Sequence, residues 1–409
     1  MSKRYVILGT SVYGIENMGD EALLNVLIRD LRKIDSDCHI TWVSRHKNDE
    51  LGKLYGVNEV IIGLEHETKE ASNGRWFNGL NFGDNTEHLK VLGDRISKAD
   101  ALIIGGDPFQ QITLSFNRGL APYAANLITL AKFYGVKTVL YSIHMGVHLT
   151  DGYAKELTKF CIENADLTTL REEFSLDILN DMGLNTTNCK VVADSAWALD
   201  LVDKSNSVFD SIDGFNIDWL QDKIIGVNIR HNYWQWSDRK WSKIKKNFSK
   251  FLDSICEKNN SKILFIPNCT YDIDHKMEGD ILPHFEIYEM MQNKHNAFCI
   301  ENKLNLWETL SLFPFLWAHM SNRRHSAIFA AVNRVPVLPL GGAWHVRPAF
   351  EEVDLGMNFI EPEFWTVFNL EKSFNDIISR RKNIVDKYNE VIPSLRERAQ
   401  LQAKLISEL

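Results

Sequence analysis

The sequence lacks paired cysteines, long apolar runs and an excess of basic residues, three features that mark particular protein classes. Its six cysteines are scattered, with no Cys-x-x-Cys pair and no histidine at a zinc-site spacing, so we expect reduced thiols and no metal site. No run reaches the roughly 18 apolar residues of a membrane span, and no secretory signal opens the chain, which predicts a cytoplasmic protein. A basic excess is also missing. The net charge of −8 at pH 7 argues against nucleic acid or an anionic membrane as a partner, although it leaves room for a local basic pocket.

The chain is long enough for two domains, because single hydrophobic cores stop growing at roughly 250–300 residues. It has 409 residues, of which 44% are hydrophobic and 24% charged, the composition of a globular protein. In the middle of the chain the apolar pattern dissolves into Asp, Ser, Asn and Gly. We therefore expect an N-terminal domain over residues 1–202, a linker over 203–222 and a C-terminal domain over 223–409, which closes with surface helices near 371–388 and 393–408.

Short apolar runs of strand type alternate with helical patterns in both halves. The expected strands are 5–8, 39–44, 57–62, 101–104, 138–141, 167–170 and 191–192, followed by 224–229, 263–266, 316–320 and 335–340. This alternation is typical of mostly parallel, doubly wound sheets, so we expect an α/β fold with two Rossmann-like domains. In such sheets ligands bind at the carboxyl ends of the strands. The dinucleotide fingerprint G-x-G-x-x-G is absent, so a dinucleotide is not the expected ligand.

Residues 64–95 do not fit the alternation. The stretch is polar, rich in Gly and Asn at its start, and contains Trp76 and Phe77. An insertion that covers the ligand crevice and an ordinary surface loop are both consistent with this composition.

Polar clusters follow several strands of the first half. A Gly-rich loop over 14–21 leads into a helix, whose first turn contains Asp20 and Glu21. Two glycines follow the strand at 101–104, and further clusters begin at Ser142 and Arg171. A lone arginine at a strand end is often part of a surface ion pair, but consecutive polar strand ends favour a shared cleft.

The most distinctive stretch is 316–340. A strand pattern ends in Ser321-Asn322-Arg323-Arg324-His325, and a helical pattern starts at about Ser326. The first backbone N–H groups of a helix have no intrahelical partner and carry the positive end of its dipole. With two guanidinium groups and an imidazole beside them, these groups predict an anion site.

Five motifs occur along the chain in a fixed order: Gly14-x-x-Asn17-x-Gly19-Asp20-Glu21-Ala22, Gly105-Gly106, Arg171-x-x-x-Ser175, Ala193-Asp194-Ser195 and Ser321-x-Arg323-x-His325. In this order they resemble the polysaccharide pyruvyl transferase family, from about residue 5 to about residue 350. The resemblance implies two Rossmann-like domains in the GT-B arrangement, with the donor on the C-terminal side of a cleft and the acceptor on the N-terminal side. It implies transfer of a pyruvyl group from phosphoenolpyruvate to two hydroxyls of a sugar, which gives a cyclic ketal and phosphate. The acceptor is a glycan or a glycan precursor, free or lipid-linked, and no cofactor is needed.

The resemblance also implies roles for particular residues. Ser321, Arg323 and His325 match the family's S-x-R-L-H segment, which holds phosphoenolpyruvate, and Arg171 matches the arginine of its R-D-x-x-S segment. This chain departs from the family at Arg324, where the family has leucine.

Two further departures concern loops. The family's G-G-G-x-x-x-D turn is altered here, with an acid at Asp107 and none at Gln111. A later segment whose lysine serves the donor is replaced by Gly341-Gly342-Ala343-Trp344-His345-Val346-Arg347, where Arg347 is a shifted substitute.

The chemistry of the reaction suggests a role for each of these side chains. Guanidinium forks bind both the carboxylate and the phosphate of phosphoenolpyruvate bidentately. His325 can protonate the methylene carbon or only hold the phosphate, and both interpretations stay open. Asp107, Asp20 or Glu21 can act as the base, although the last two also suit a helix start. Three tryptophans can stack on a sugar face or simply pack: Trp76, Trp234 and Trp236.

The expected catalytic residues are therefore His325 and Asp107, and the expected substrate-binding residues are Asn17, Asp20, Gly105, Gly106, Arg171, Ser321, Arg323, Arg324 and Arg347. Two alternatives remain. A GT-B glycosyltransferase that uses a nucleotide sugar would place the diphosphate at the same helix start. A catalytically silent glycan-binding relative is suggested by the altered turn and the missing lysine.

Overall fold

In a computed structural model of the chain, the structure describes residues 2–9, 17–44, 49–63, 86–106, 108–109, 120–146, 152–232, 235–270, 279–342, 346–353 and 358–409. Asp107, Gln111, Trp76 and Trp234 lie outside these ranges, as does most of the expected insertion over 64–95. The last part of that insertion belongs to helix α4 (Thr86–Ser97).

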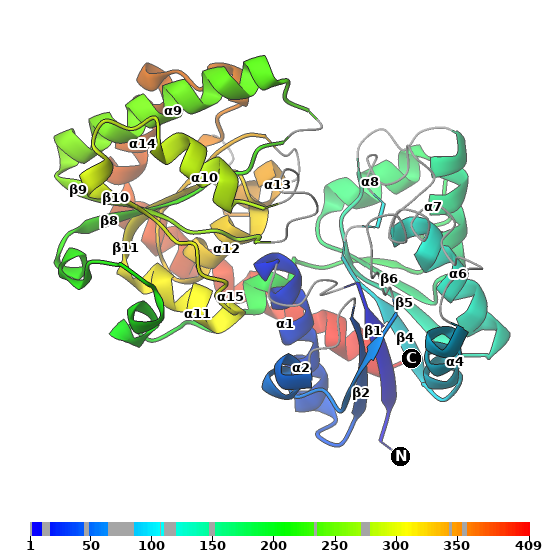
Figure 1. Ribbon diagram of the computed structural model, residues 1–409. Helices are drawn as coiled ribbons and strands as arrows, with labels where there is room; N and C mark the ends of the chain where they lie inside the picture. The colour runs from blue at the N-terminus through cyan, green and yellow to red at the C-terminus, as the bar shows by residue number, and fades with distance from the viewer. Residues whose placement is uncertain are drawn as a thin grey trace. The chain divides into compact units, whose positions relative to one another are not determined.

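The chain forms two compact units (Figure 1). The first contains Met1–Gly14, Asp20–Ala198 and Leu395–Leu409, and the second contains Ile15–Gly19 and Leu199–Ser394. The main boundary, between Ala198 and Leu199, lies close to the expected one. Two short segments differ from the expectation: Ile15–Gly19 belongs to the second unit and Leu395–Leu409 to the first.

The expected linker over 203–222 is part of the second unit. It contains two short 3-10 helices, η2 (Asn206–Ser211) and η3 (Ile217–Gln221). Phe209 stacks on Phe215 with ring centroids 4.5 Å apart and packs edge-on against Phe315 at 5.0 Å. These aromatic contacts explain why a polar stretch is folded rather than extended.

The first unit is built on a seven-stranded parallel sheet with the order β3-β2-β1-β4-β5-β6-β7. Its strands are β1 (Arg4–Leu8), β2 (His39–Ser44), β3 (Glu59–Ile62), β4 (Ala101–Ile104), β5 (Lys137–Ile143), β6 (Leu167–Leu170) and β7 (Cys189–Val191). Its other helices are α1 (Met18–Ile34), α2 (Asp49–Tyr55), α6 (Leu120–Phe133), α7 (Gly152–Asn164) and α8 (Glu173–Asp181), although Met18 and Gly19 of α1 belong to the second unit. Strands β1, β4 and β5 are almost entirely buried, as expected for a sheet covered by helices on both faces.

The second unit has a five-stranded parallel sheet with the order β10-β9-β8-β11-β12. Its strands are β8 (Lys223–Asn228), β9 (Ser261–Phe265), β10 (Ala297–Cys299), β11 (Leu316–Ser321) and β12 (Val337–Pro339). Its helices are α9 (Asp238–Asn259), α10 (Ile281–Tyr288), α11 (Leu306–Leu312), α12 (Arg324–Val332), α13 (Val346–Glu351), α14 (Val367–Ser379) and the first half of α15 (Arg381–Ser407). Figure 1 shows α9, α10 and α14 together on one face of this sheet and α11 and α12 on the other. Every strand expected from the sequence is present, and the three-residue strand β10 was not expected.

The end of the chain differs from the expectation of two surface helices. Helix α15 continues through Pro393 as a single helix, and many of its apolar side chains are buried. Gln402 near its end donates to the carbonyl of Ala193 (3.1 Å) and to Ser195 Oγ (2.9 Å), within the first unit. The last turns are therefore part of the core packing of that unit. Among the described residues, no helix has the length and apolarity that crossing a bilayer requires.

Candidate functional site

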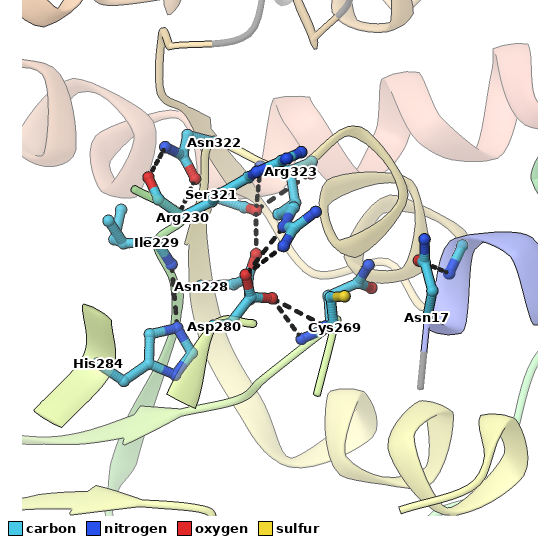
Figure 2. Close-up of polar contacts among 12 residues, drawn as sticks. Asn17, Asn228, Ile229, Arg230, Cys269, Asp280, His284, Ser321, Asn322 and Arg323 are labelled. Atoms are coloured by element: carbon cyan, nitrogen blue, oxygen red, sulfur yellow. Dashed lines mark hydrogen bonds and ion pairs between the residues drawn. The ribbon is translucent and has the colours of Figure 1, made fainter. Parts of the chain in front are cut away.

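The candidate site of the second unit lies where its strand order reverses, between β8 and β11. Ser321, the last residue of β11, is in register with Asn228, the last residue of β8. Its hydroxyl donates to Asn228 Oδ1 (3.2 Å) and accepts from the backbone N–H of Arg323 (2.9 Å). These bonds hold the turn from strand to helix, so buried Ser321 fixes the backbone here (Figure 2). A ligand crevice at such a reversal is the general rule for open parallel sheets.

Helix α12 begins at Arg324, two residues earlier than the apolar pattern indicates. Arg323 is the residue before the helix, with extended backbone angles (φ −105°, ψ 124°), and Arg324 and His325 stand in the first turn. Arg324 is buried and His325 is half-buried. The three basic side chains therefore stand at a helix start, and the anion site expected there stays a prediction.

Asp280 is the central acceptor of this cluster (Figure 2). Its Oδ1 accepts from Nε (2.9 Å) and Nη2 (2.5 Å) of Arg323. Its Oδ2 accepts from Asn228 Nδ2 and from the backbone N–H groups of Asn268 and Cys269, each at 2.9 Å. Asp280 thus joins the ends of β8, β9 and β11 and fixes the plane of the Arg323 guanidinium.

The charges in this cluster are set by burial and by each other. Burial alone would raise the pKa of Asp280, but the Arg323 charge and the hydrogen bonds outweigh it, so the pKa lies below its usual range. His284 is also buried, and burial lowers its pKa to about 4. The imidazole is therefore neutral at pH 7, and its Nε2 accepts the backbone N–H of Ile229 (3.1 Å). An ionised Asp280 beside a charged Arg323 follows from this arrangement.

The first sequence motif lies against the last one within the second unit. Asn17 forms an antiparallel bridge with Cys269, and the backbone N–H of Met18 donates to the carbonyl of Asn268 (2.9 Å). Asn17 Oδ1 accepts from the N–H of Gly19 (3.2 Å), which shapes the start of α1 (Figure 2). A Cβ atom on Gly19 would lie 2.2 Å from Nδ1 of His325. Residue 19 must therefore be glycine if the His325 ring is to keep its place.

Several buried polar atoms near these strand ends have no hydrogen-bond partner within the described ranges. They include the Nδ2 and Oδ1 of Asn232 and the Oδ1 of Asn268. Leaving such an atom unpaired costs roughly 1–3 kcal/mol unless a ligand or water meets it. The site is therefore suited to a polar ligand.

The strand ends of the first unit form a second polar cluster. Arg171 is only 2% exposed; its Nε donates to the carbonyl of Ser142 (2.5 Å), and its Nη1 lies 3.5 Å from Asp194 Oδ2. His144 Nδ1 and Ser175 Oγ both lie 2.5 Å from Glu172 Oε1. Arg171 is therefore held in a buried ion pair, and its expected role in substrate binding stays a prediction.

The two glycines after β4 have a backbone role. Gly106 has a positive φ of 83°, and a Cβ there would lie 2.4 Å from the carbonyl oxygen of Gly9. A Cβ on Gly9 would in turn lie 2.5 Å from the carbonyl oxygen of Gly105. The residues that directly follow β1 and β4 thus lie in backbone contact, which only glycine permits.

The remaining expected site residues are spread over both units. Arg347 lies on α13, more than half exposed, and pairs with Glu351 one turn away (3.0 Å). Asp20 is half-buried in the first turn of α1, whereas Glu21 is fully buried. Trp236 is 3% exposed and packs against other aromatic rings. Of its two expected roles, sugar stacking and packing, the structure therefore shows packing.

Asp280, His284 and Asn268 were not expected from the sequence. Asp280 directly precedes α10, where an acid is ordinarily interpreted as a helix cap, yet its side chain makes no capping bond. Its partners come from three other strand ends, and no local pattern signals such contacts.

A family model described as polysaccharide pyruvyl transferase matches residues 17–342, beginning at the asparagine of the first motif. The chain belongs to the polysaccharide pyruvyl transferase family. The resemblance expected from five motifs is thereby confirmed, and with it the assignment to a family of transferases. No curated protein matches the sequence.

Solved structures similar to this pyruvyl transferase family member show its fold. UDP-GlcNAc 2-epimerase from Neisseria meningitidis bound to UDP-GlcNAc is 11% identical with a TM-score of 0.61, covering 100% of both chains. UDP-GlcNAc 2-epimerase from Methanocaldococcus jannaschii is 14% identical with a TM-score of 0.61, also over 100% of both chains. A glycosyltransferase from Rickettsia africae ESF-5 is 12% identical with a TM-score of 0.58, covering 100% of this chain and 98% of that one. The expected α/β fold with two Rossmann-like, GT-B-like domains is confirmed. The cleft between them stays a prediction.

Proposed function

We propose that the protein transfers the pyruvyl group of phosphoenolpyruvate to two hydroxyls of one sugar in a glycan or glycan precursor, with release of phosphate. The observation that carries this proposal is the contact between the first and last motifs of the family in one unit, where Gly19 lies against His325. Family membership supplies the group transferred, and the basic helix start supplies a suitable anion site.

Phosphoenolpyruvate binds, on this proposal, at the start of α12. The donor carries a phosphate and a carboxylate, and both are matched by arginine forks of fixed orientation. Asp280 holds the Arg323 guanidinium through two of its nitrogens before any ligand arrives. Such preorganisation lowers the entropy that binding would otherwise cost.

The reaction then proceeds by proton transfer and two additions. His325 delivers a proton to the methylene carbon, C2 becomes electrophilic, and one sugar hydroxyl adds to it and loses its proton. Phosphate leaves with its bonding electrons, and the second hydroxyl adds to C2 and loses its proton. The products are a cyclic ketal and phosphate, and an imidazole suits this work because its pKa lies nearest neutrality.

The base is proposed to be Asp20 or Asp107. Asp20 follows Gly19 directly and is half-buried, so it combines partial access with nearness in the chain to the His325 contact. Glu21 is disfavoured as the base, because it is fully buried. Neither a metal nor a cofactor is required by this chemistry, which stays a prediction.

The test is a direct comparison of donors. The purified protein is incubated with candidate glycans and either phosphoenolpyruvate or nucleotide sugars, and phosphate, nucleotide and product mass are measured. Phosphate release with a product heavier by one pyruvyl ketal supports the proposal, and nucleotide release contradicts it. Phosphoenolpyruvate binding is measured in parallel by calorimetry, with Arg323→Ala against the exposed control Arg381→Ala. Only the first substitution is expected to weaken binding.

A further inference from the structure

We propose that the outer surface of α9 and α14 is a docking site for the anionic lipid headgroups of a membrane surface. The proposal concerns a different face of the second unit from the strand-end site and does not depend on the proposed reaction. The proposed partner is a bilayer surface rather than a span.

A basic stripe runs along the outer side of α9. Arg239, Lys243, Lys246 and Lys250 follow the spacing i, i+4, i+7 and i+11, which puts them within one narrow face over about 16 Å. All four are exposed, and within the described part of the chain none of them pairs with an acidic side chain. The opposite side of the helix is buried by Trp241, Ile244, Phe248, Phe251, Leu252 and Ile255.

The other lysines of α9 differ from the stripe in having acidic partners. Lys240 pairs with Glu363 (2.5 Å), Lys245 with Glu286 (2.8 Å) and Lys258 with Glu371 (2.9 Å). These three lysines flank the stripe, and their charges are neutralised by neighbouring elements. The outward charges are therefore the ones left for an external anion.

The stripe borders a hollow of about 410 Å³ whose lining includes Arg239, Lys240 and Lys243 on one side and Pro362, Glu363 and Trp365 on the other. Asn247 holds this segment to the helix by donating to the carbonyl of Trp365 (2.8 Å). Three basic side chains against the one acidic side chain of Glu363 give the hollow a net positive lining, which suits a phosphodiester headgroup.

Two large aromatic side chains lie exposed beside the hollow. Phe364 is 61% exposed and Phe368 is 73% exposed. Asn369, next to Phe368, donates to the carbonyl of Phe364 (3.0 Å), so the two phenylalanines belong to one local structure. Lys372 follows Phe368 by one turn of α14 and is also exposed.

Helix α14 runs beside α9, as the bonds of Glu371 to Ser254 and Lys258 require (Figure 1). Its buried side is formed by Leu370, Phe374 and Ile377, which directs Phe368 and Lys372 outward like the stripe. Basic side chains beside exposed aromatic rings are the pattern of proteins that bind the interface of a bilayer. A soluble polyanion would contact the lysines but gains little from the rings, whereas the net charge of −8 weighs equally against both partners and leaves room only for a local basic surface such as this one.

The test is co-sedimentation of the full chain with vesicles of phosphatidylcholine, alone or with phosphatidylglycerol added. We expect binding only when phosphatidylglycerol is present, and weaker binding as salt is raised. Since each basic residue near an anionic surface contributes roughly fivefold in binding, Lys243→Glu/Lys246→Glu/Lys250→Glu should reduce it by more than about 100-fold. Phe364→Ser/Phe368→Ser should reduce it further at high salt.

The matched control carries the same charge change on other exposed surfaces: Lys53→Glu/Lys132→Glu/Lys382→Glu. It should bind vesicles like the unchanged chain, and both triple variants should retain phosphoenolpyruvate binding and thermal stability. The proposal is overturned if the unchanged chain does not bind the anionic vesicles, if the two triple variants bind equally, or if heparin is bound while vesicles are not. If the unchanged chain does not bind phosphoenolpyruvate, that result counts against the proposed function and not against the docking site.

Discussion

Two buried arginines, one in each unit, follow strands of parallel sheets and face a buried aspartate. Arg171 pairs with Asp194 in the first unit, and Arg323 pairs with Asp280 in the second. In sequence both appear as basic residues at strand ends, yet their surroundings differ. Arg323 directly precedes its helix and lies 2.5 Å from its aspartate, whereas Glu172 separates Arg171 from α8 and the distance to its aspartate is 3.5 Å. We expect the neighbours, rather than the arginine, to distinguish a ligand site from a structural ion pair, and the binding role of either arginine stays a prediction.

The polar groups around Arg171 largely satisfy one another. Thr169 Oγ1 donates to Gln402 Oε1 (2.8 Å), Gln402 Nε2 donates to Ser195 Oγ (2.9 Å), and Ser195 Oγ donates to Ser142 Oγ (3.1 Å). The chain of bonds ties the end of α15 to strands β5 and β6. We therefore expect the Arg171 cluster to act in stability alone and the Arg323 cluster to act in both stability and binding.

The largest expected effect comes from breaking the Arg323 ion pair. Asp280→Ala leaves a buried guanidinium and two backbone N–H groups without their acceptor, and should cost roughly 3–5 kcal/mol of unfolding free energy. Denaturant unfolding of this variant and of Asp194→Ala measures the comparison. A loss below about 1 kcal/mol for Asp280→Ala would show that the Asp280 network is not the structural centre of the second unit.

Acidification should destabilise the second unit by a similar amount. The pKa of buried His284 lies at about 4 in the folded chain against 6.5 for an unburied imidazole, so the unfolded chain binds a proton first as the pH falls. Stability is full above pH 6.5 and is lost progressively down to about pH 4, by about 3 kcal/mol for this residue. The pH dependence of unfolding should flatten in His284→Gln. An unchanged pH profile in that variant would contradict the assignment.

Conservative arginine substitutions separate the two clusters. Arg323→Lys loses the fork held by Asp280 and should raise the donor KM by roughly 10- to 100-fold. Arg171→Lys should lower the unfolding free energy by about 1–3 kcal/mol and leave the donor KM nearly unchanged. Steady-state kinetics and denaturant unfolding of both variants check this. A raised donor KM in Arg171→Lys, with an unchanged donor KM in Arg323→Lys, would assign donor binding to the first unit instead.

The smallest expected effect concerns the contact of Gly19 with His325. Gly19→Ala puts a methyl group 2.2 Å from Nδ1 of the ring and should lower kcat by about tenfold while changing stability by less than about 1 kcal/mol, since alanine favours the helix. Gly93→Ala is the control, because that helical glycine has room, its nearest neighbour lying 3.9 Å from the added Cβ. Equal kcat in both variants would show that the ring position does not matter for turnover.

The sequence predicts the fold well because its signals are local. Apolar runs and turn residues placed every expected strand, and the basic cluster after β11 was located from five consecutive residues. Within that cluster only the helix start was misplaced, by two residues, because polar Arg324 and His325 do not continue the apolar pattern.

What the sequence could not predict depends on contacts between distant segments. Residues 17–19 lie in the second unit through backbone bonds to Asn268 and Cys269, and backbone groups are the same in every residue. Asp280 resembles a helix cap, and the linker is folded by aromatic contacts such as that of Phe209 with Phe315. In each case the partner lies far away in the chain, so local patterning does not reveal it.

The most direct test of the central claim is a crystal structure with phosphoenolpyruvate soaked in. We predict the phosphate and carboxylate at the start of α12, within hydrogen-bond distance of Arg323, with the His325 ring still against Gly19. Density for the donor at the strand ends of the first unit beside Arg171, with none at α12, would contradict the account.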